Sequence, residues 1–323
     1  MKKLSRRCLL RASAAAAAAG LVSSIAPLGP LRATSVFADN LPHLQFPTTP
    51  RERLAVASWP FRAEIESPSN EYRDKKKPGI DLKDFAAKTR ERFHVTGFEP
   101  LSSHFPSTDE HYVKSFREAI EKAGVHVVNI PVDNDHSFYD SDAAARQQLV
   151  QQCKHWVDVA VLLGSPSLRT SIASAKNAKP NVDLTAETLR PLVDYAASKN
   201  VLINLENDNP VSEDPTFLVE VLGTVSHPYL HALPDFCNSM ANTGNAQFND
   251  KALAMLFPRA YSICHVKDSE VGDGGKVSRV DLPHIFTILK ASNYRGYCSM
   301  EWEGPEDPYV GTDRLIAASL ANL

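Results

Sequence analysis

The chain of 323 residues has only five cysteines, and none shows the spacing of a CxxC or zinc-finger motif. Four of them, Cys153, Cys237, Cys264 and Cys298, lie beyond the N-terminal leader, and three of these lie at the ends of predicted strands. We therefore expect buried thiols and not disulfides. The sequence also lacks an internal repeat and, beyond the leader, any low-complexity tract.

The first 38 residues have the features of an export signal. A basic stretch with the pair Arg6 and Arg7 precedes an Ala-rich, weakly apolar segment and a small-residue exit at 36–38. This pattern predicts a twin-arginine signal peptide that is cleaved near Ala38, with an uncleaved anchor as the alternative. The apolar segment is too short and too rich in alanine for a stable span. We expect a periplasmic or secreted protein that folds, and takes up any metal, before export.

The charge of the chain argues against nucleic acid as a partner. The formal net charge is −3, and the predicted leader carries six Lys and Arg and no acid, so removing it leaves −9. An acidic protein repels a phosphate backbone. Beyond a predicted linker at 39–52, residues 53–323 form one predicted domain of the size of a single α/β barrel.

Apolar runs of the buried parallel type alternate with amphipathic helical patterns along this domain. The predicted strands are 54–59, 97–101, 125–132, 165–170, 201–207, 230–236, 261–268 and 297–303. The predicted helices are 82–93, 109–124, 143–164, 185–200, 215–225, 250–257 and 282–293. Eight strands that alternate with helices of this length predict an α/β fold, a single (β/α)8 TIM barrel.

One connection, at 62–81, is longer than the others and contains Lys75, Lys76 and Lys77. We expect a solvated excursion at the mouth of the barrel, and a substrate lid is the alternative.

Carboxylates and one histidine stand at the ends of four successive predicted strands. They are Glu206, Asp235, His265 and Glu301. The carboxyl ends of the strands form the active-site rim of such a barrel. Three crowded carboxylates raise one another's pKa unless a cation neutralises them. A mainly oxygen set with one imidazole therefore predicts one divalent metal ion: Mn²⁺, Mg²⁺, Co²⁺ or Zn²⁺. Glu303 shares a strand face with Glu301 and is an alternative ligand.

Further residues of the predicted rim are candidates for contact with a substrate, and a structural role is the alternative for each. Lys267 shares a strand face with His265 and is placed to steady an oxyanion. Arg169, His104 and Arg62 have the chemistry to bind hydroxyls or a phosphate. Trp59 offers an apolar ring face for a sugar. Trp302 offers the same kind of apolar face as Trp59, and Glu99, at the end of the second predicted strand, is a further candidate for contact with a substrate.

The order and spacing of these motifs resemble the sugar phosphate isomerase/epimerase family of xylose isomerase-like TIM barrels (AP endonuclease family 2), which includes ketose 3-epimerases, inosose dehydratases and the endonuclease IV branch. The motifs are LAVASWPF, GFEPL, LINLEND, LPDFCN, CHVKD and GYCSMEWEG, and they extend from about Leu54 to near the end of the chain. The resemblance implies that Glu206, Asp235, His265 and Glu301 hold the metal, and that Glu206 and Glu301 are the catalytic acid/base pair.

One position departs from the pattern of the epimerases. They usually have a His three residues after the Asp of the sixth strand, where this chain has Asn238. Asn238 can hydrogen-bond a hydroxyl of a substrate, but it cannot shuttle a proton or bind a metal as His does.

These features favour an exported, metal-dependent isomerase or epimerase that acts on a keto-sugar or polyol by proton transfer next to a carbonyl, through an enediolate. A lyase or dehydratase acting on a keto-glycoside or inosose would use the same site. An endonuclease IV-like hydrolase would need a His-rich metal cluster and a basic groove, and a non-catalytic sugar-binding barrel is the remaining alternative. The expected partner is a small-molecule sugar, with no nucleic acid and no stable membrane anchor, and a homo-oligomer is left open.

Overall fold

The structure is a computed structural model that describes residues 41–241, 243–271 and 275–323. The predicted twin-arginine leader and its cleavage site near Ala38 lie outside these residues. In the part of the chain that is described, no helix is long and apolar enough to cross a membrane.

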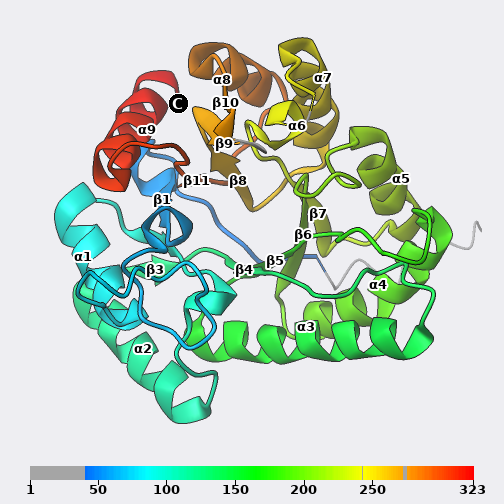
Figure 1. Ribbon diagram of the computed structural model, residues 1–323, viewed down its shortest axis with the longest axis horizontal. Coiled ribbons are helices and arrows are strands. Elements are labelled where there is room, and N and C mark those ends of the chain that lie inside the picture. The colour runs from blue at the N-terminus through cyan, green and yellow to red at the C-terminus, as the bar shows by residue number, and fades with distance from the viewer. Residues whose placement is uncertain (1–40, 242, 272–274) are drawn as a thin grey trace, which may run out of the picture. The chain divides into compact units, whose positions relative to one another are not determined.

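Buried parallel strands form the wall of a barrel, and Figure 1 shows helices arranged around their outer side. The strands are short and nearly all their residues are buried, because helices cover the outer face and side chains fill the interior. They are β1 Leu54–Ala57, β2 Gly97–Glu99, β3 His126–Val127, β4 Ile130–Val132, β5 Ser167–Thr170, β6 Leu202–Glu206, β7 Leu230–Leu233, β8 Ile263–Val266 and β11 Tyr297–Met300.

The hydrogen bonds between strands form two sheets, and the run 125–132 contributes one strand to each of them. The sheet orders are β3-β2-β1-β11-β8 and β4-β5-β6-β7. The run 125–132, predicted as one strand, is interrupted at Val128 and Asn129, because β3 pairs with β2 whereas β4 pairs with β5. Isolated parallel bridges, Ala232 to Ala260 and Asp235 to His265, join the sheets at the other seam. The predicted (β/α)8 barrel is confirmed.

Several helices have an N-cap residue whose side chain accepts a hydrogen bond from a backbone N–H group of the first turn. Examples are Asp81, Asp109 and Asn181. Gly124 and Gly164 end two of them with positive φ. The helices are α1 Leu82–Phe93, α2 Glu110–Ala123, α3 Ala143–Leu163, α4 Val182–Ser198, α5 Pro215–Val225, α6 Asn238–Ala241, α7 Ala246–Leu256, α8 Leu282–Ala291 and α9 Pro308–Asn322, with short 3-10 helices at Arg51–Arg53, Trp59–Phe61, Ser102–His104 and Phe257–Arg259.

Helix α9 is absent from the helical patterns predicted from the sequence. It contains Gly311, and a Cβ atom there would lie 2.3 Å from the ring of Trp302. The glycine lets the helix approach that ring, which is 4% exposed and packs in the core. Trp302 thus has a packing role and is not among the residues that line the cavity described below.

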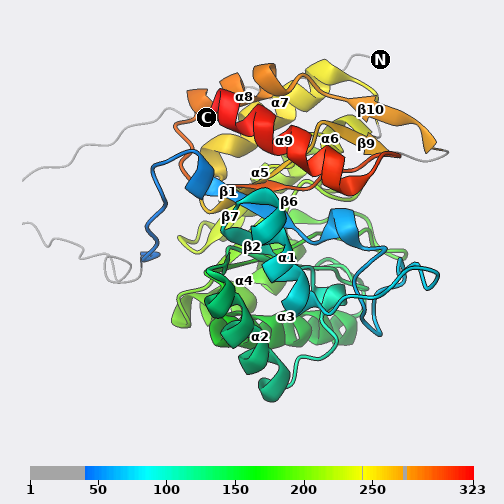
Figure 2. The ribbon, with the colours of Figure 1, turned by 90° about the vertical axis from the view of Figure 1, so that its left-hand side faces the viewer.

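Two of the connections at the carboxyl ends of the strands are longer than a simple turn: a hairpin after β8 and a loop after β1. An antiparallel hairpin, β9 Ser269–Val271 and β10 Val277–Arg279, follows β8 and was not predicted. Figure 2 shows it at the same end of the barrel as the long loop after β1. Inside that loop, Asn70 Nδ2 donates to the carbonyl oxygens of Arg62 and Ile65, each at 2.7 Å. The loop is therefore internally braced.

The four cysteines of the barrel are buried and free, as predicted. Cys264 and Cys298 are register partners on β8 and β11, with their Sγ atoms 3.7 Å apart.

Candidate metal centre

Four side chains from adjoining strands converge at the carboxyl end of the barrel. Glu206 ends β6, Asp235 follows β7, His265 lies on β8 and Glu301 follows β11. One ligand atom of each lies within 4.8 Å of the others, and all four residues are buried. The structure therefore brings together the four residues that the sequence singled out as metal ligands.

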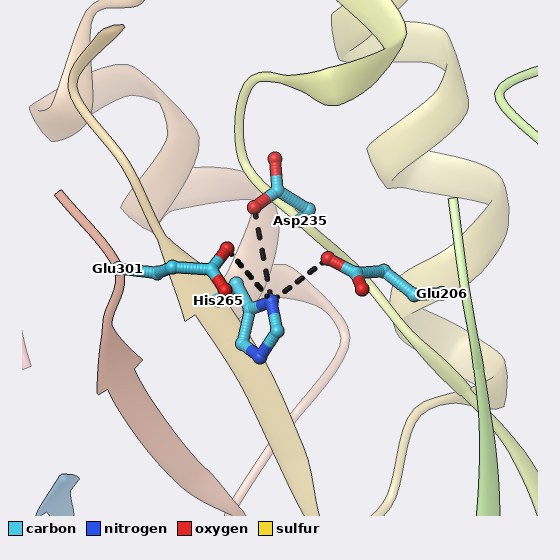
Figure 3. A group of neighbouring side chains, drawn as sticks. All are labelled: Glu206, Asp235, His265 and Glu301. Carbon is cyan, nitrogen blue, oxygen red and sulfur yellow. Dashed lines mark hydrogen bonds and ion pairs between the residues drawn. The ribbon is translucent and has the colours of Figure 1, made fainter. Parts of the chain in front are cut away.

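The carboxylates surround one nitrogen of the imidazole, as Figure 3 shows. His265 Nδ1 lies 2.8 Å from Glu206 Oε1, 3.1 Å from Glu301 Oε2 and 4.0 Å from Asp235 Oδ2. Asp235 Oδ1 accepts the backbone N–H groups of Cys237 and Asn238, both at 2.8 Å. Asp235 Oδ2 has no hydrogen-bond partner among the described residues. One carboxylate oxygen is thus anchored by the backbone, and the other lies 3.6 Å from Lys267 Nζ without a hydrogen bond to it.

The electrostatics of the cluster favour a positive charge at its centre. Burial opposes a charge on His265, but Glu301, Glu99 and Glu206 together raise the pKa of its imidazole well above the usual value. Burial raises the pKa of Asp235 to about 7. A group of buried carboxylates that recruits protons in this way has the charge to bind a divalent cation.

The two glutamates differ from Asp235 because each is close to cations. Burial opposes the ionisation of Glu206, yet Arg169 and His265 lower its pKa. Burial likewise opposes the ionisation of Glu301, and His265 and Lys267 lower its pKa. Both glutamates are therefore held as carboxylates, the form that binds a metal or accepts a proton.

Arg169 and Lys267, both predicted to contact a substrate, are nearly buried beside these carboxylates. Arg169 Nε lies 2.6 Å from Glu206 Oε2, and its Nη1 lies 2.7 Å from Asp133 Oδ1. Lys267 Nζ lies 2.9 Å from Glu270 Oε2 and 3.2 Å from Glu301 Oε2. Each cation thus neutralises carboxylates of this chain.

Asn238, also predicted to contact a substrate, connects the two sides of the cluster. Its Oδ1 accepts from Lys267 Nζ at 3.1 Å, and its Nδ2 donates to Glu206 Oε1 at 3.4 Å.

A cavity of about 330 Å³ opens onto Glu206 and Glu301. Four of the residues predicted to contact a substrate line it: Asn238, Arg169, Lys267 and Trp59. Sequence reasoning missed several other polar residues of its wall. They are Asp133, Asn134, Ser171, Asp208, Asn209 and Glu270. Asp133 and Asn134 directly follow β4, and Asp208 and Asn209 follow β6, so their position after predicted strands was a usable signal.

Glu303 takes a different role from Glu301. Strand β11 ends at Met300, so the predicted strand 297–303 is wrong beyond that residue and alternation no longer sets the direction of the side chains. Glu303 accepts from Trp59 Nε1 at 2.9 Å and from Arg62 Nη2 at 3.3 Å. It forms part of the cavity wall, and the four-residue cluster contains Glu301.

His104 and Glu99 lie away from the cavity wall. His104 is fully buried, with Nδ1 2.9 Å from Ser58 Oγ, and burial lowers its pKa to about 3 with a contribution from Arg62. It is therefore neutral at pH 7. Glu99 lies behind His265, with Oε1 3.0 Å from His265 Nε2, and not at the position of a substrate contact.

Comparisons with known proteins identify the family of the chain. Residues 90–321 match the family described as xylose isomerase-like TIM barrel, and the chain belongs to this family. The comparison with curated proteins found no match.

Solved structures with the same fold include enzymes of several activities. A D-psicose 3-epimerase from Clostridium cellulolyticum H10, with D-tagatose, is 14% identical at a TM-score of 0.64, over 83% of this chain and 96% of that chain. A xylose isomerase-like TIM barrel protein from Mycobacterium smegmatis, in complex with magnesium, is 15% identical at a TM-score of 0.63, over 83% of this chain and 97% of that chain. A probable 3-DHS dehydratase from Bacillus anthracis is 16% identical at a TM-score of 0.61, over 82% of this chain and 97% of that chain. At these identities the likeness establishes the fold.

Proposed function

We propose that this protein is an exported, metal-dependent isomerase or epimerase that moves a proton next to the carbonyl of a keto-sugar or polyol, through an enediolate. The observation that carries the proposal is the convergence of Glu206, Asp235, His265 and Glu301, with ligand atoms within 4.8 Å of one another. Glu206 and Glu301 lie on opposite sides of His265 (Figure 3).

The four side chains fit one divalent ion. They offer three carboxylate oxygens and one imidazole nitrogen, a set that suits Mn²⁺, Mg²⁺, Co²⁺ or Zn²⁺. Asp235 Oδ2 is a buried oxygen without a hydrogen-bond partner among the described residues, as expected of a ligand. When bound, such an ion polarises a carbonyl and an adjacent hydroxyl of the substrate.

The chain's own residues move the proton. Glu301 and Glu206 both line the cavity and lie on opposite sides of His265 (Figure 3), so one removes a proton from the carbon next to the carbonyl and the other returns one to the opposite face. Arg169, 2.6 Å from Glu206 Oε2, and Lys267, 3.2 Å from Glu301 Oε2, hold the two carboxylates in place. Asn238 contributes a hydrogen bond to a substrate hydroxyl, and Trp59 an apolar wall.

The charge of the cavity favours an uncharged sugar over a phosphorylated one. In the described part of the chain, its wall contains six carboxylates and two cations, Arg169 and Lys267. Both cations already pair with carboxylates. A substrate phosphate would therefore meet net negative charge with no free cation to receive it. A neutral sugar is also the substrate expected of a protein exported under the predicted twin-arginine signal.

A lyase or dehydratase on a keto-glycoside or inosose is the second candidate. Asn238 cannot shuttle a proton, and a dehydratase shares the fold at a TM-score of 0.61. Elimination begins with the same removal of a proton next to a carbonyl. An endonuclease IV-like hydrolase is disfavoured, because the four-residue cluster contains a single histidine and the cavity is acidic.

The test is solvent deuterium exchange. Metal-loaded protein is incubated in D₂O with a panel of neutral keto-sugars, keto-glycosides and inososes, and products are followed by NMR. We expect deuterium at the carbon next to the carbonyl, with an epimer or isomer as product; an unsaturated product would assign a lyase instead. Glu301→Gln should slow exchange by at least about 100-fold, and Glu118→Gln, at an exposed position of α2, should leave it unchanged. Sugar binding without exchange across the panel would indicate a binding barrel.

A further inference from the structure

Glu99, the last residue of β2, is a buried carboxylate that faces the metal centre from behind. Its side chain is fully buried, and Oε1 lies 3.0 Å from His265 Nε2. The other imidazole nitrogen, Nδ1, faces Glu206, Glu301 and Asp235. The two nitrogens therefore have distinct surroundings: a single carboxylate on one side, and the proposed ligand set on the other.

A chain of buried hydrogen bonds across the barrel interior holds Glu99. Ser262 Oγ donates to Asn204 Oδ1 at 3.0 Å, and Asn204 Nδ2 donates to Asn129 Oδ1 at 3.4 Å. Ser167 Oγ also donates to Asn129 Oδ1, at 2.7 Å. Asn129 Nδ2 then donates to Glu99 Oε1 at 2.7 Å. Since Asn129 receives donors at its oxygen, its amide N–H points to Glu99, and Glu99 is the acceptor at the end of the chain.

The interruption of the third barrel strand makes this arrangement possible. Asn129 lies between β3 and β4, where the chain changes its pairing from β2 to β5. Its side chain bridges Glu99 of β2 to Ser167 of β5 at this point. The network thus joins strands on both sides of the seam.

We propose that Glu99 is a positioning residue that accepts Nε2–H of His265 and so presents the Nδ1 lone pair to the divalent ion. A neutral imidazole carries one N–H and one lone pair, so an acceptor at Nε2 fixes both the tautomer and the ring orientation. This inference rests on the proposed function, because it assigns the nitrogen that binds the ion of the proposed site.

Removal of Glu99 has a measurable consequence. Without it the imidazole loses its anchor, and Asn129 Nδ2 loses its acceptor. Loss of such an outer partner typically lowers metal affinity by about 10-fold to 100-fold. In Glu99→Gln an amide oxygen can replace Oε1 and accept the same two N–H groups without the charge, so the loss should be smaller.

The first measurement is the affinity for Zn²⁺ and Co²⁺, by titration against a competing chelator. We expect Glu99→Ala to bind about 10-fold to 100-fold more weakly than wild type, with Glu99→Gln between them. The matched control is Ser299→Ala. Ser299 is the buried register partner of His265, and its Oγ has no hydrogen-bond partner among the described residues. The Ser299→Ala variant should bind Zn²⁺ and Co²⁺ with the affinity of wild type.

The second measurement is ¹⁵N NMR of the His side chains in Zn²⁺-loaded wild type, with His265 identified by the signal lost in His265→Gln. We expect a protonated Nε2 and a metal-bound Nδ1. A metal-bound Nε2, or Glu99→Ala binding as tightly as wild type, would overturn the role of Glu99 and leave the proposed metal site intact. A wild-type protein that binds no divalent ion would overturn both.

Discussion

Arg169 Nε lies 2.6 Å from Glu206 Oε2, and both side chains are almost completely buried. The pair joins strands β5 and β6 at the rim, where Glu206 also faces His265. Arg169 thus compensates the charge of a glutamate that the proposed chemistry requires as a carboxylate.

Arg169→Met should lower the free energy of unfolding by about 3 kcal/mol, because it removes the guanidinium 2.6 Å from Glu206 Oε2 and leaves His265 as the cation beside that buried carboxylate. Urea unfolding of the metal-free protein measures it. Arg117→Met is the control: Arg117 and Glu121 form an exposed pair on α2, and its loss should cost about 0.3–0.5 kcal/mol. Equal losses in the two variants would contradict a stabilising role for the buried pair.

Asn238→Ala should reduce kcat/KM for the proposed exchange reaction by at least about 10-fold, because the loss of a single hydrogen bond already has an effect of that order. The variant loses the amide that accepts from Lys267 and donates to Glu206, as well as the proposed contact with a substrate hydroxyl. Metal content should remain that of wild type, because the four ligands stay. Loss of the metal in this variant would show that Asn238 supports the ligand set and would refute a role confined to the substrate.

His104 predicts a pH dependence of stability. Burial, with a contribution from Arg62, lowers the pKa of folded His104 to about 3, whereas the unfolded chain takes up this proton near pH 6.5. Its contribution to stability is therefore present above pH 6.5 and is lost progressively as the pH falls toward 3. Between pH 6.5 and pH 5 wild type should lose about 2 kcal/mol more than His104→Gln.

Urea unfolding at several pH values measures this difference. From pH 7.5 to pH 8.5 His104 is almost entirely neutral in both the folded and the unfolded protein, so the difference in stability between wild type and variant should stay constant there. A gap that is also constant from pH 6.5 to pH 5 would show that His104 can be protonated in the folded protein.

The fold could be predicted from the sequence because its parallel strands are continuous apolar runs separated by amphipathic helices. The change of strand partner at Asn129 could not be predicted, because the switch from β2 to β5 is a tertiary event that Asn129 and Pro131 do not by themselves indicate. Helix α9 was missed for a related reason. Its Gly311 weakens the helical pattern. A glycine is needed there because the helix packs closely against the ring of Trp302, a tertiary contact that local sequence patterns do not reveal.

The convergence of four side chains could be predicted, because each stands at the end of a strand-like run: Glu206, Asp235, His265 and Glu301. The surroundings of these residues depend on the register between strands, which one sequence does not reveal. From its place at a strand end Glu99 is a candidate for contact with a substrate or for a structural role, and the structure places it against His265 Nε2. Glu303 was expected beside Glu301, but β11 ends at Met300 and Glu303 pairs with Trp59 and Arg62.

The most direct test of the account is the metal content of the mature protein, purified without added metal and analysed for elements beside Glu206→Ala and Glu301→Ala. Glu118→Ala, at an exposed position of α2, serves as the control. The account predicts about one divalent ion per chain in wild type and control, and a lost or weakened ion in both site variants. A wild-type protein that holds no divalent ion, even after incubation with Mn²⁺ or Co²⁺, would contradict it.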